Sequence, residues 1–192
     1  MTRGAGPGER RDEPRTYTAL LRGVNVGGKN KLPMKDLVAM FAAAGCADVR
    51  SYIQSGNVVF RASAALAERV PGIITSEVAD RFGFRAPVVL RSADELEAVR
   101  RGNPYLRPGV DVEALHVLFL ADRPSRERVA ALDPDRSPPD SFAVRGREIY
   151  LHCPNGIART KLTNDYFDSR LATTTTGRNW KTVLALVEMT RV

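Results

Sequence analysis

The stretch TYTALLRGVNVGGKNKLPMKDLVAMFAAAGCADVRSYIQSGNVVFR, residues 16–61, decides the fold. It begins with an apolar, β-prone run at residues 16–21, which predicts a buried strand. Pro33 then suits the first turn of a helix, whose apolar residues follow at helical spacing until Gly45. The first part of this stretch therefore predicts a strand, a connecting loop and an amphipathic helix.

Two β-rich runs end the stretch, at residues 50–54 and 57–61. Ser55-Gly56 between them is typical of a two-residue hairpin turn. A second amphipathic helix is expected over residues 66–82, and Pro71-Gly72 should kink it or split off its first turns. The last elements of this half are a strand at residues 86–90 and a helix that a capping box at residues 92–95 opens.

The same order of elements recurs in the second half of the chain. The expected elements are a strand at residues 114–120, a short helix from Pro124, a hairpin of residues 141–144 and 148–152 turning at Arg145-Gly146-Arg147, a helix at 161–171, a strand at 172–176 and a closing helix at 180–189.

The order β-α-β-β-α-β is the split βαβ of ferredoxin-like folds. We therefore predict an α+β protein of two tandem ferredoxin-like (βαββαβ) half-domains packed together. The halves are expected at residues 16–105 and 112–192, the second with an extra C-terminal helix, and residues 1–15 form a predicted disordered tail. One continuous mixed sheet is the alternative architecture.

Composition excludes several classes of protein. The chain has 192 residues, of which 43% are hydrophobic and 27% charged, values that are ordinary for a globular protein. No apolar run approaches the roughly 18 residues of a membrane span, and residues 1–15 have no signal-peptide pattern. Two cysteines cannot form a disulfide framework, and two histidines cannot build a four-ligand metal site without help from carboxylates. We expect a cytoplasmic protein without a metal, a cofactor or a membrane partner.

Positive charge is concentrated towards the two ends of the chain. The net charge is +7; residues 16–62 carry six basic and two acidic residues, and residues 150–192 carry six basic and three acidic ones. If the two regions share one recess, with Arg22 facing Arg178, they would attract anions. The alternative is a general compositional bias, because arginine supplies 24 of the 29 basic residues.

The glycine-rich segment at residues 23–30 is the sharpest local motif. It matches the G-x-x-x-x-G-K part of a P-loop, but Asn30 stands where a P-loop has Ser or Thr, and Pro33 delays the helix. A more general interpretation is a loop whose glycines let backbone N–H groups approach an anion or a polar ring. An ordinary tight turn is the alternative. The candidate ligand-binding residues are Arg22, Asn25, Gly27, Gly28, Lys29, Lys31, Arg178 and Asn179.

Two other polar motifs lie outside this loop in the sequence. Residues 54–57 form a hairpin turn, which we expect at the end of the sheet opposite the glycine-rich loop, so the two motifs need not meet. Arg178 at a helix start opposes the helix dipole, which indicates an anionic partner: a ligand, or an acidic side chain such as Asp165 or Asp168. Gly177 or a neighbouring threonine is expected to cap that last helix.

Candidate nucleophiles and base-stacking groups are weak. His152 and Cys153 are adjacent in a predicted strand, so their side chains should diverge, and a buried cysteine is seldom a nucleophile. His116 reads as a hydrogen-bonded strand residue. Tyr17 and Phe60 lie on the central strands, but without the RNA-recognition-motif pattern, so only electrostatic binding of nucleic acid stays open.

Three strings together resemble the bacterial domain of unknown function 1697 family: LLRGVNVGGKNKLPMKDL (residues 20–37), YIQSGNVVF (52–60) and TTGRNWKTVLAL (175–186). The similarity runs over about residues 17–189. It implies a small bacterial cytoplasmic α+β protein with a duplicated ferredoxin-like architecture, and no established activity. The chain departs from the family pattern in its long N-terminal tail and in Pro71-Gly72.

The function that fits these features is binding of an anionic ligand, either nucleic acid or a phosphorylated small molecule. Arg, Lys, Asn, Gln and Thr side chains hold charge and hydrogen bonds but do not shuttle protons near neutral pH, so we lean away from an enzyme. The alternatives are a small enzyme, in which Lys29 and Arg22 stabilise charge on a phosphorylated metabolite, and a structural or regulatory homodimer without a ligand.

Overall fold

The chain, in a computed structural model that describes residues 13–191, folds as two compact units. Residues 13–93 and 189–191 form the first unit, and residues 94–188 form the second. The predicted tail at residues 1–15 falls mostly outside the described residues, and its last member, Arg15, already pairs with Ala62 in a strand. The predicted first half ran to residue 105 and included the helix after the fourth strand, whereas the second unit begins at residue 94 and contains nearly all of that helix. The division into halves stays a prediction.

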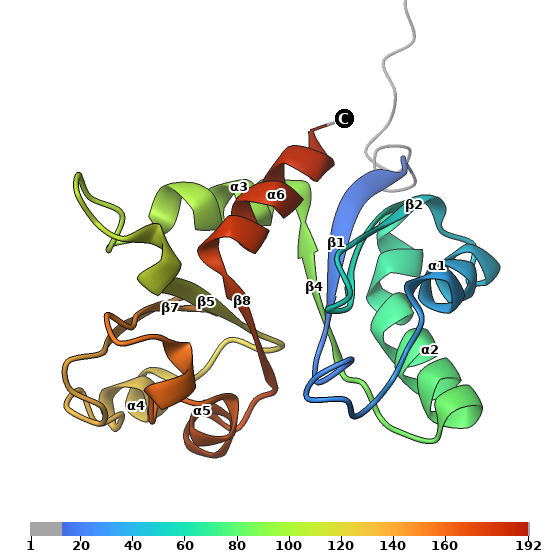
Figure 1. Cartoon of the computed structure of the whole chain (residues 1–192). Coiled ribbons are helices and arrows are strands. Elements are labelled where there is room, and N and C mark those ends of the chain that lie inside the picture. Colours follow the sequence, from blue (N-terminus) through green and yellow to red (C-terminus); the bar gives the residue numbers. More distant parts are fainter. Residues whose placement is uncertain (1–12, 192) are drawn as a thin grey trace, which may run out of the picture. The chain divides into compact units, whose positions relative to one another are not determined.

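The first unit is one antiparallel sheet with two helices on one face (Figure 1). Its elements are β1 (Arg15–Leu21), α1 (Met34–Ala43), β2 (Ala47–Tyr52), β3 (Asn57–Ala62), α2 (Ala64–Phe82) and β4 (Val88–Ser92). The strands lie in the order β2-β3-β1-β4. Alternate residues of the central strands, such as Leu21 and Phe60, pack with Phe41 of α1 and Ile74 of α2 into the core. This two-residue alternation is the reason why the sheet has a helix-covered face.

The second unit contains a second four-stranded antiparallel sheet, in the order β6-β7-β5-β8. Its elements are α3 (Ala93–Gly102), β5 (Leu115–Leu120), α4 (Arg126–Ala130), β6 (Ser141–Arg145), β7 (Glu148–His152), α5 (Asn164–Leu171), β8 (Thr175–Asn179) and α6 (Trp180–Thr190), with short 3-10 helices at Val112–Ala114 and Ile157–Arg159. Leu118 and Leu151 pack with Phe167 of α5 on one face. On the other face, the Tyr150 hydroxyl donates to the Val99 carbonyl oxygen of α3 at 3.3 Å.

The described part of the chain is therefore an α+β protein with two separate sheets and six α-helices, and the alternative of one continuous sheet is wrong. Several helix starts follow from local capping. The Ser63 hydroxyl accepts from the Leu66 amide at the start of α2, and Thr163 caps α5 in the same way. Gly83, at φ 74°, ends α2 in the left-handed conformation.

Four local predictions are wrong. Pro71 does not split off the first turns of α2, which was one of the two effects expected of it, since the helix runs unbroken over its 19 residues. Tyr52 pairs with Asn57, so the β2–β3 turn has four residues, not two. The helix predicted from residue 161 begins at Asn164, because Thr163 caps it. The strand predicted at residues 172–176 is β8, three residues later, because Ala172 ends α5 in the left-handed conformation.

No helix within residues 13–191 is both long enough and apolar enough to cross a membrane.

Candidate functional site

The loop between β1 and α1 forms a miniature hairpin. Val26 and Lys29 make an isolated antiparallel bridge, and the Lys29 amide donates to the Val26 carbonyl oxygen at 3.0 Å. Gly27 and Gly28 between them have φ values of 56° and 76°. Positive φ at both central residues is the conformation of a type I′ turn, which glycine adopts without strain. A Cβ on either glycine would meet no atom within 4 Å, so the tip of the loop is open.

This geometry rules against a P-loop. In a P-loop the glycine run leads directly into a helix, whose N-terminus faces the phosphate. Here the run closes into a hairpin, and α1 begins only at Met34, after a segment that Leu32 anchors in the core at 1% exposure. The strands beside β1 are antiparallel to it, so the sheet has no parallel neighbour to carry a metal-binding acid.

Asn25 holds the hairpin in place. Its Nδ2 group donates to the carbonyl oxygens of Leu32 (2.9 Å) and Gln54 (2.8 Å), and its Oδ1 accepts from the Leu32 amide (2.8 Å). Its φ of 55° lies in the left-handed region, which asparagine tolerates better than most residues. Both Nδ2 protons are therefore used within the fold, and Asn25 positions the loop.

The glycine-rich loop and the β2–β3 turn lie side by side, so the expectation that they occupy opposite ends of the sheet is wrong. Leu20 pairs with Asn57, and the Leu21 amide donates to the Gly56 carbonyl oxygen at 2.8 Å. A Cβ on Gly56 would lie 2.5 Å from Cγ2 of Val24. Because β3 lies between β1 and β2 and is antiparallel to both, β1 and β2 run in the same direction and finish at the same end of the sheet. The pairing of β1 with β3, rather than a local sequence motif, places residues 53–56 in the site.

Charge and exposure distinguish this end of the sheet. Residues 16–35 contain four cations and no acidic residue. Lys29 and Lys31 are exposed, and Arg22 is half-buried. Two apolar side chains are also exposed here, Val26 at 64% and Ile53 at 52%. The site can hold an anion through charge and through the open amides of the turn, and it presents an apolar surface beside them.

Arg178 and Asn179, the other predicted site residues, lie in the second unit. Arg178 is 8% exposed, and its Nη1 donates to the Thr176 hydroxyl (2.9 Å) and to the Gly177 carbonyl oxygen (2.7 Å). Burial lowers the pKa of this guanidinium to about 10. Asn179 Oδ1 accepts from the Thr182 amide at 2.8 Å, so Asn179, rather than Gly177 or a threonine, caps α6.

The predicted recess shared by Arg22 and Arg178 joins residues of two different units and stays a prediction. Asp168, one of the acidic partners considered for Arg178, accepts hydrogen bonds from the Thr175 amide (2.7 Å) and hydroxyl (2.8 Å). These bonds tie α5 to the start of β8. The carboxylate therefore has a structural role in the second unit.

The cysteines and histidines give no nucleophilic site among the described residues. Cys46 and Cys153 are buried thiols, and burial raises the pKa of each to about 11, so both are neutral near pH 7. Burial also lowers the pKa of His116. His152 stacks on Tyr105 with ring centroids 5.8 Å apart. Within residues 13–191, no group of three or more His, Cys, Asp or Glu side chains could hold a metal ion.

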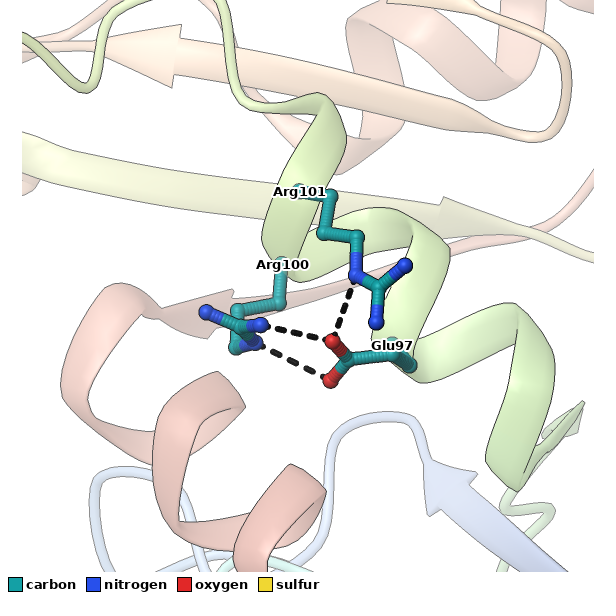
Figure 2. A network of polar contacts seen from close by, with 3 residues as sticks. All are labelled: Glu97, Arg100 and Arg101. Atoms are coloured by element: carbon teal, nitrogen blue, oxygen red, sulfur yellow. Dashed lines mark hydrogen bonds and ion pairs between the residues drawn. The ribbon is translucent and has the colours of Figure 1, made fainter.

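Not every cluster of basic residues is available to an anion. On α3, the Glu97 carboxylate accepts from Nη2 (2.6 Å) and Nε (3.0 Å) of Arg100 and from Nε of Arg101 (2.7 Å) (Figure 2). The carboxylate raises the pKa of Arg100 and neutralises part of the charge of this pair. The loop cations Lys29 and Lys31 have no such carboxylate partner among the described contacts.

Comparisons with known proteins connect this geometry to a family. No curated protein matches the chain. The structure of conserved bacterial protein SP0830 from Streptococcus pneumoniae matches with a TM-score of 0.71 and 24% identity, covering 94% of this chain and 100% of that one. At this identity the likeness concerns the fold alone. The family model described as "Protein of unknown function (DUF1697)" matches residues 15–150, which include the whole glycine-rich loop and the β2–β3 turn. The chain therefore belongs to the DUF1697 family of proteins of unknown function.

Proposed function

We propose that the protein binds an anionic ligand, a nucleic acid or a phosphorylated small molecule, at the glycine-rich loop (residues 22–32) and the adjoining β2–β3 turn (residues 53–56). The open hairpin tip carries the proposal. Gly27 and Gly28 expose their backbone, and within residues 13–191 their N–H groups donate no hydrogen bond. Free amides that point out of a tight turn are suited to an anion, because no side chain blocks the approach.

The residues around the tip have distinct functions in this proposal. Lys29 and Lys31 are exposed and supply positive charge next to the amides. Asn25 holds the tip in its conformation through three hydrogen bonds, so the binding groups are ordered before the ligand arrives. Arg22 adds charge at the base of the loop. Arg178 and Asn179 join the site only if the predicted recess exists.

The finer statement of the fold is also a proposal. We propose that the two sheets represent two tandem ferredoxin-like halves. The support is that both sheets have the same strand order relative to the chain, β2-β3-β1-β4 and β6-β7-β5-β8, with antiparallel neighbours throughout. The proposal further places the protein in the cytoplasm, a reducing compartment in which the free thiols of Cys46 and Cys153 persist.

Fluorescence anisotropy with a labelled single-stranded oligonucleotide, together with calorimetry using pyrophosphate, tests the binding proposal. We expect the parent protein to bind at least one of these two probes. The double variant Lys29→Ala/Lys31→Ala should bind that probe at least about tenfold more weakly than the parent protein does. The matched control is Arg15→Ala/Arg69→Ala, which removes the same charge from exposed positions at the start of β1 and in α2. Its affinity should stay within about twofold of that of the parent protein.

The salt dependence gives an independent criterion. Oligonucleotide binding should weaken between about 50 and 200 mM salt, with a slope that falls by about two in the loop variant. Equal losses in the loop variant and in the control would show only a general charge effect and would contradict the proposal. Absence of binding by both probes would do the same.

A further inference from the structure

The second unit repeats the backbone arrangement that holds the glycine-rich loop. In the first unit the Leu21 amide, at the end of β1, donates to the Gly56 carbonyl oxygen at 2.8 Å; in the second, the Leu120 amide, at the end of β5, donates to the Arg147 carbonyl oxygen at 2.9 Å. The next amides form a matching pair of bonds, from Arg22 to Pro87 (2.9 Å) and from Ala121 to Thr174 (2.9 Å). The β5–α4 loop and the β6–β7 turn are therefore equivalent in place to the loop and turn of the proposed site.

Two adjoining depressions, of about 430 and 570 Å³, lie at this place and share Arg123 and Gly146. These volumes are in the range of small-molecule sites. The lining belongs entirely to the second unit. Its charged members are four arginines and two glutamates: Arg123, Arg126, Arg145, Arg147, Glu95 and Glu148.

The arginines differ in how far the fold already uses them. Arg147 forms an ion pair with Glu95 and donates to the Ala121 carbonyl oxygen at 3.3 Å. Arg145 donates from Nη1 to the carbonyl oxygen of Gly102, at the end of α3, at 2.7 Å. Arg123 and Arg126 are exposed, and within residues 13–191 neither side chain makes a hydrogen bond or an ion pair. At least two guanidinium groups therefore keep all their donors.

The turn between β6 and β7 brings these groups together. Arg145 pairs with Glu148, which leaves Gly146-Arg147 as a two-residue turn, and Gly146 has a φ of 65°. Positive φ at the first position alone is the type II′ pattern that favours glycine there. Nη2 of Arg123 comes within 3.9 Å, and Oε2 of Glu148 within 3.7 Å, of the point where a Cβ on Gly146 would stand, so a cation from the β5–α4 loop and a carboxylate of β7 both lie at the turn.

We propose that this arginine-lined depression, formed by the β5–α4 loop and the β6–β7 turn, is a second anion site that binds the phosphate group of a small molecule. A guanidinium offers parallel N–H donors that match two oxygens of one phosphate, and arginine supplies every cation here. Depressions of this volume suit a small phosphorylated molecule. The site belongs to the second unit and does not depend on the function proposed for the glycine-rich loop.

Titration of the isotope-labelled full-length protein with inorganic phosphate and with adenosine monophosphate, at constant ionic strength, tests this proposal. The Gly146 amide reports on the second site, and the Gly27 and Gly28 amides report on the first. We expect a saturable shift at Gly146 with at least one probe. The variant Arg123→Gln/Arg126→Gln should raise the dissociation constant measured at Gly146 by about tenfold or more.

The matched control is Arg107→Gln/Arg159→Gln, which removes two exposed arginines of the same unit that line neither depression. It should leave the titration at Gly146 unchanged. Lys29→Ala/Lys31→Ala should also leave it unchanged, even if that variant abolishes binding at the loop. Equal weakening in both arginine variants, no saturable shift at Gly146, or binding of an oligonucleotide but of neither small probe would overturn the proposal.

Discussion

Replacing Asn25 tests whether one side chain locks the glycine-rich loop to the β2–β3 turn. Asn25→Ala removes three hydrogen bonds and leaves the Leu32 amide and two carbonyl oxygens without a side-chain partner. Each bond contributes about 0.5–1.5 kcal/mol, and water replaces part of this because Asn25 is only half-buried. Alanine at a φ of 55° adds about 1 kcal/mol of strain. The expected loss of folding free energy is therefore about 2–4 kcal/mol.

Asn30 provides a matched control in the same loop. It also has a positive φ, 51°, but its side chain makes a single hydrogen bond, to the Gly23 carbonyl oxygen at 2.9 Å. Asn30→Ala should therefore destabilise the protein by about 1–2 kcal/mol. Asn25→Gly should recover about 1 kcal/mol of the loss in Asn25→Ala, because glycine adopts the left-handed conformation without strain.

Urea unfolding followed by far-ultraviolet circular dichroism measures the global effect, and hydrogen exchange of the Leu32 amide measures the local one. Exchange at Leu32 should accelerate in Asn25→Ala and stay near the parent rate in Asn30→Ala, because Leu32 donates to Asn25. If Asn25→Ala costs no more than Asn30→Ala and exchange at Leu32 is unchanged, the asparagine does not hold the loop.

Two further outcomes are expected. Gly56→Ala should lower the free energy of unfolding by about 1–3 kcal/mol, because the new Cβ would lie 2.5 Å from Val24 Cγ2 and 2.8 Å from Leu21 Cβ, at a φ of 69°. A loss below about 0.5 kcal/mol in urea unfolding would contradict the close approach of turn and loop. Burial raises the pKa of the Cys46 and Cys153 thiols from 9.0 to about 11. As the pH rises, the unfolded chain therefore loses these two protons before the folded protein does. Stability should therefore fall between about pH 9 and 11, and changing both cysteines to alanine should remove that part of the pH dependence in denaturation measured at each pH.

Local sequence signals predicted the elements best where a short-range interaction fixes them. The β6–β7 hairpin has its strands within one residue of the predicted ends, because Gly146 fits a two-residue turn. The end of α2 at Phe82 also matches the prediction, because Gly83 adopts the left-handed conformation there. Pro71 shows the limit of this reasoning: packing of Val70 and Ile74 in the core keeps α2 unbroken across a residue that weakens an isolated helix.

Only part of the candidate site could be predicted from the sequence. Its cations and glycines were visible in the sequence, but the partners of Asn25 were not. The Gln54 carbonyl oxygen is 29 positions away along the chain, and only the pairing of β1 with β3 brings it to the loop. In the second unit, the sequence predicted only a turn at Arg145-Gly146-Arg147. These arginines lie near Arg123 because the Leu120 amide, at the end of β5, donates to the Arg147 carbonyl oxygen of that turn.

The sequence by itself determined the order of the elements, the family and the excess of positive charge in the glycine-rich loop, because each is a property of residues that are neighbours along the chain. Only the tertiary structure decided which end of the sheet the β2–β3 turn occupies and which polar side chains the fold already uses. Strand pairing joins segments far apart in sequence, so a hydrogen bond such as that of Asn25 to Gln54 has no local signature.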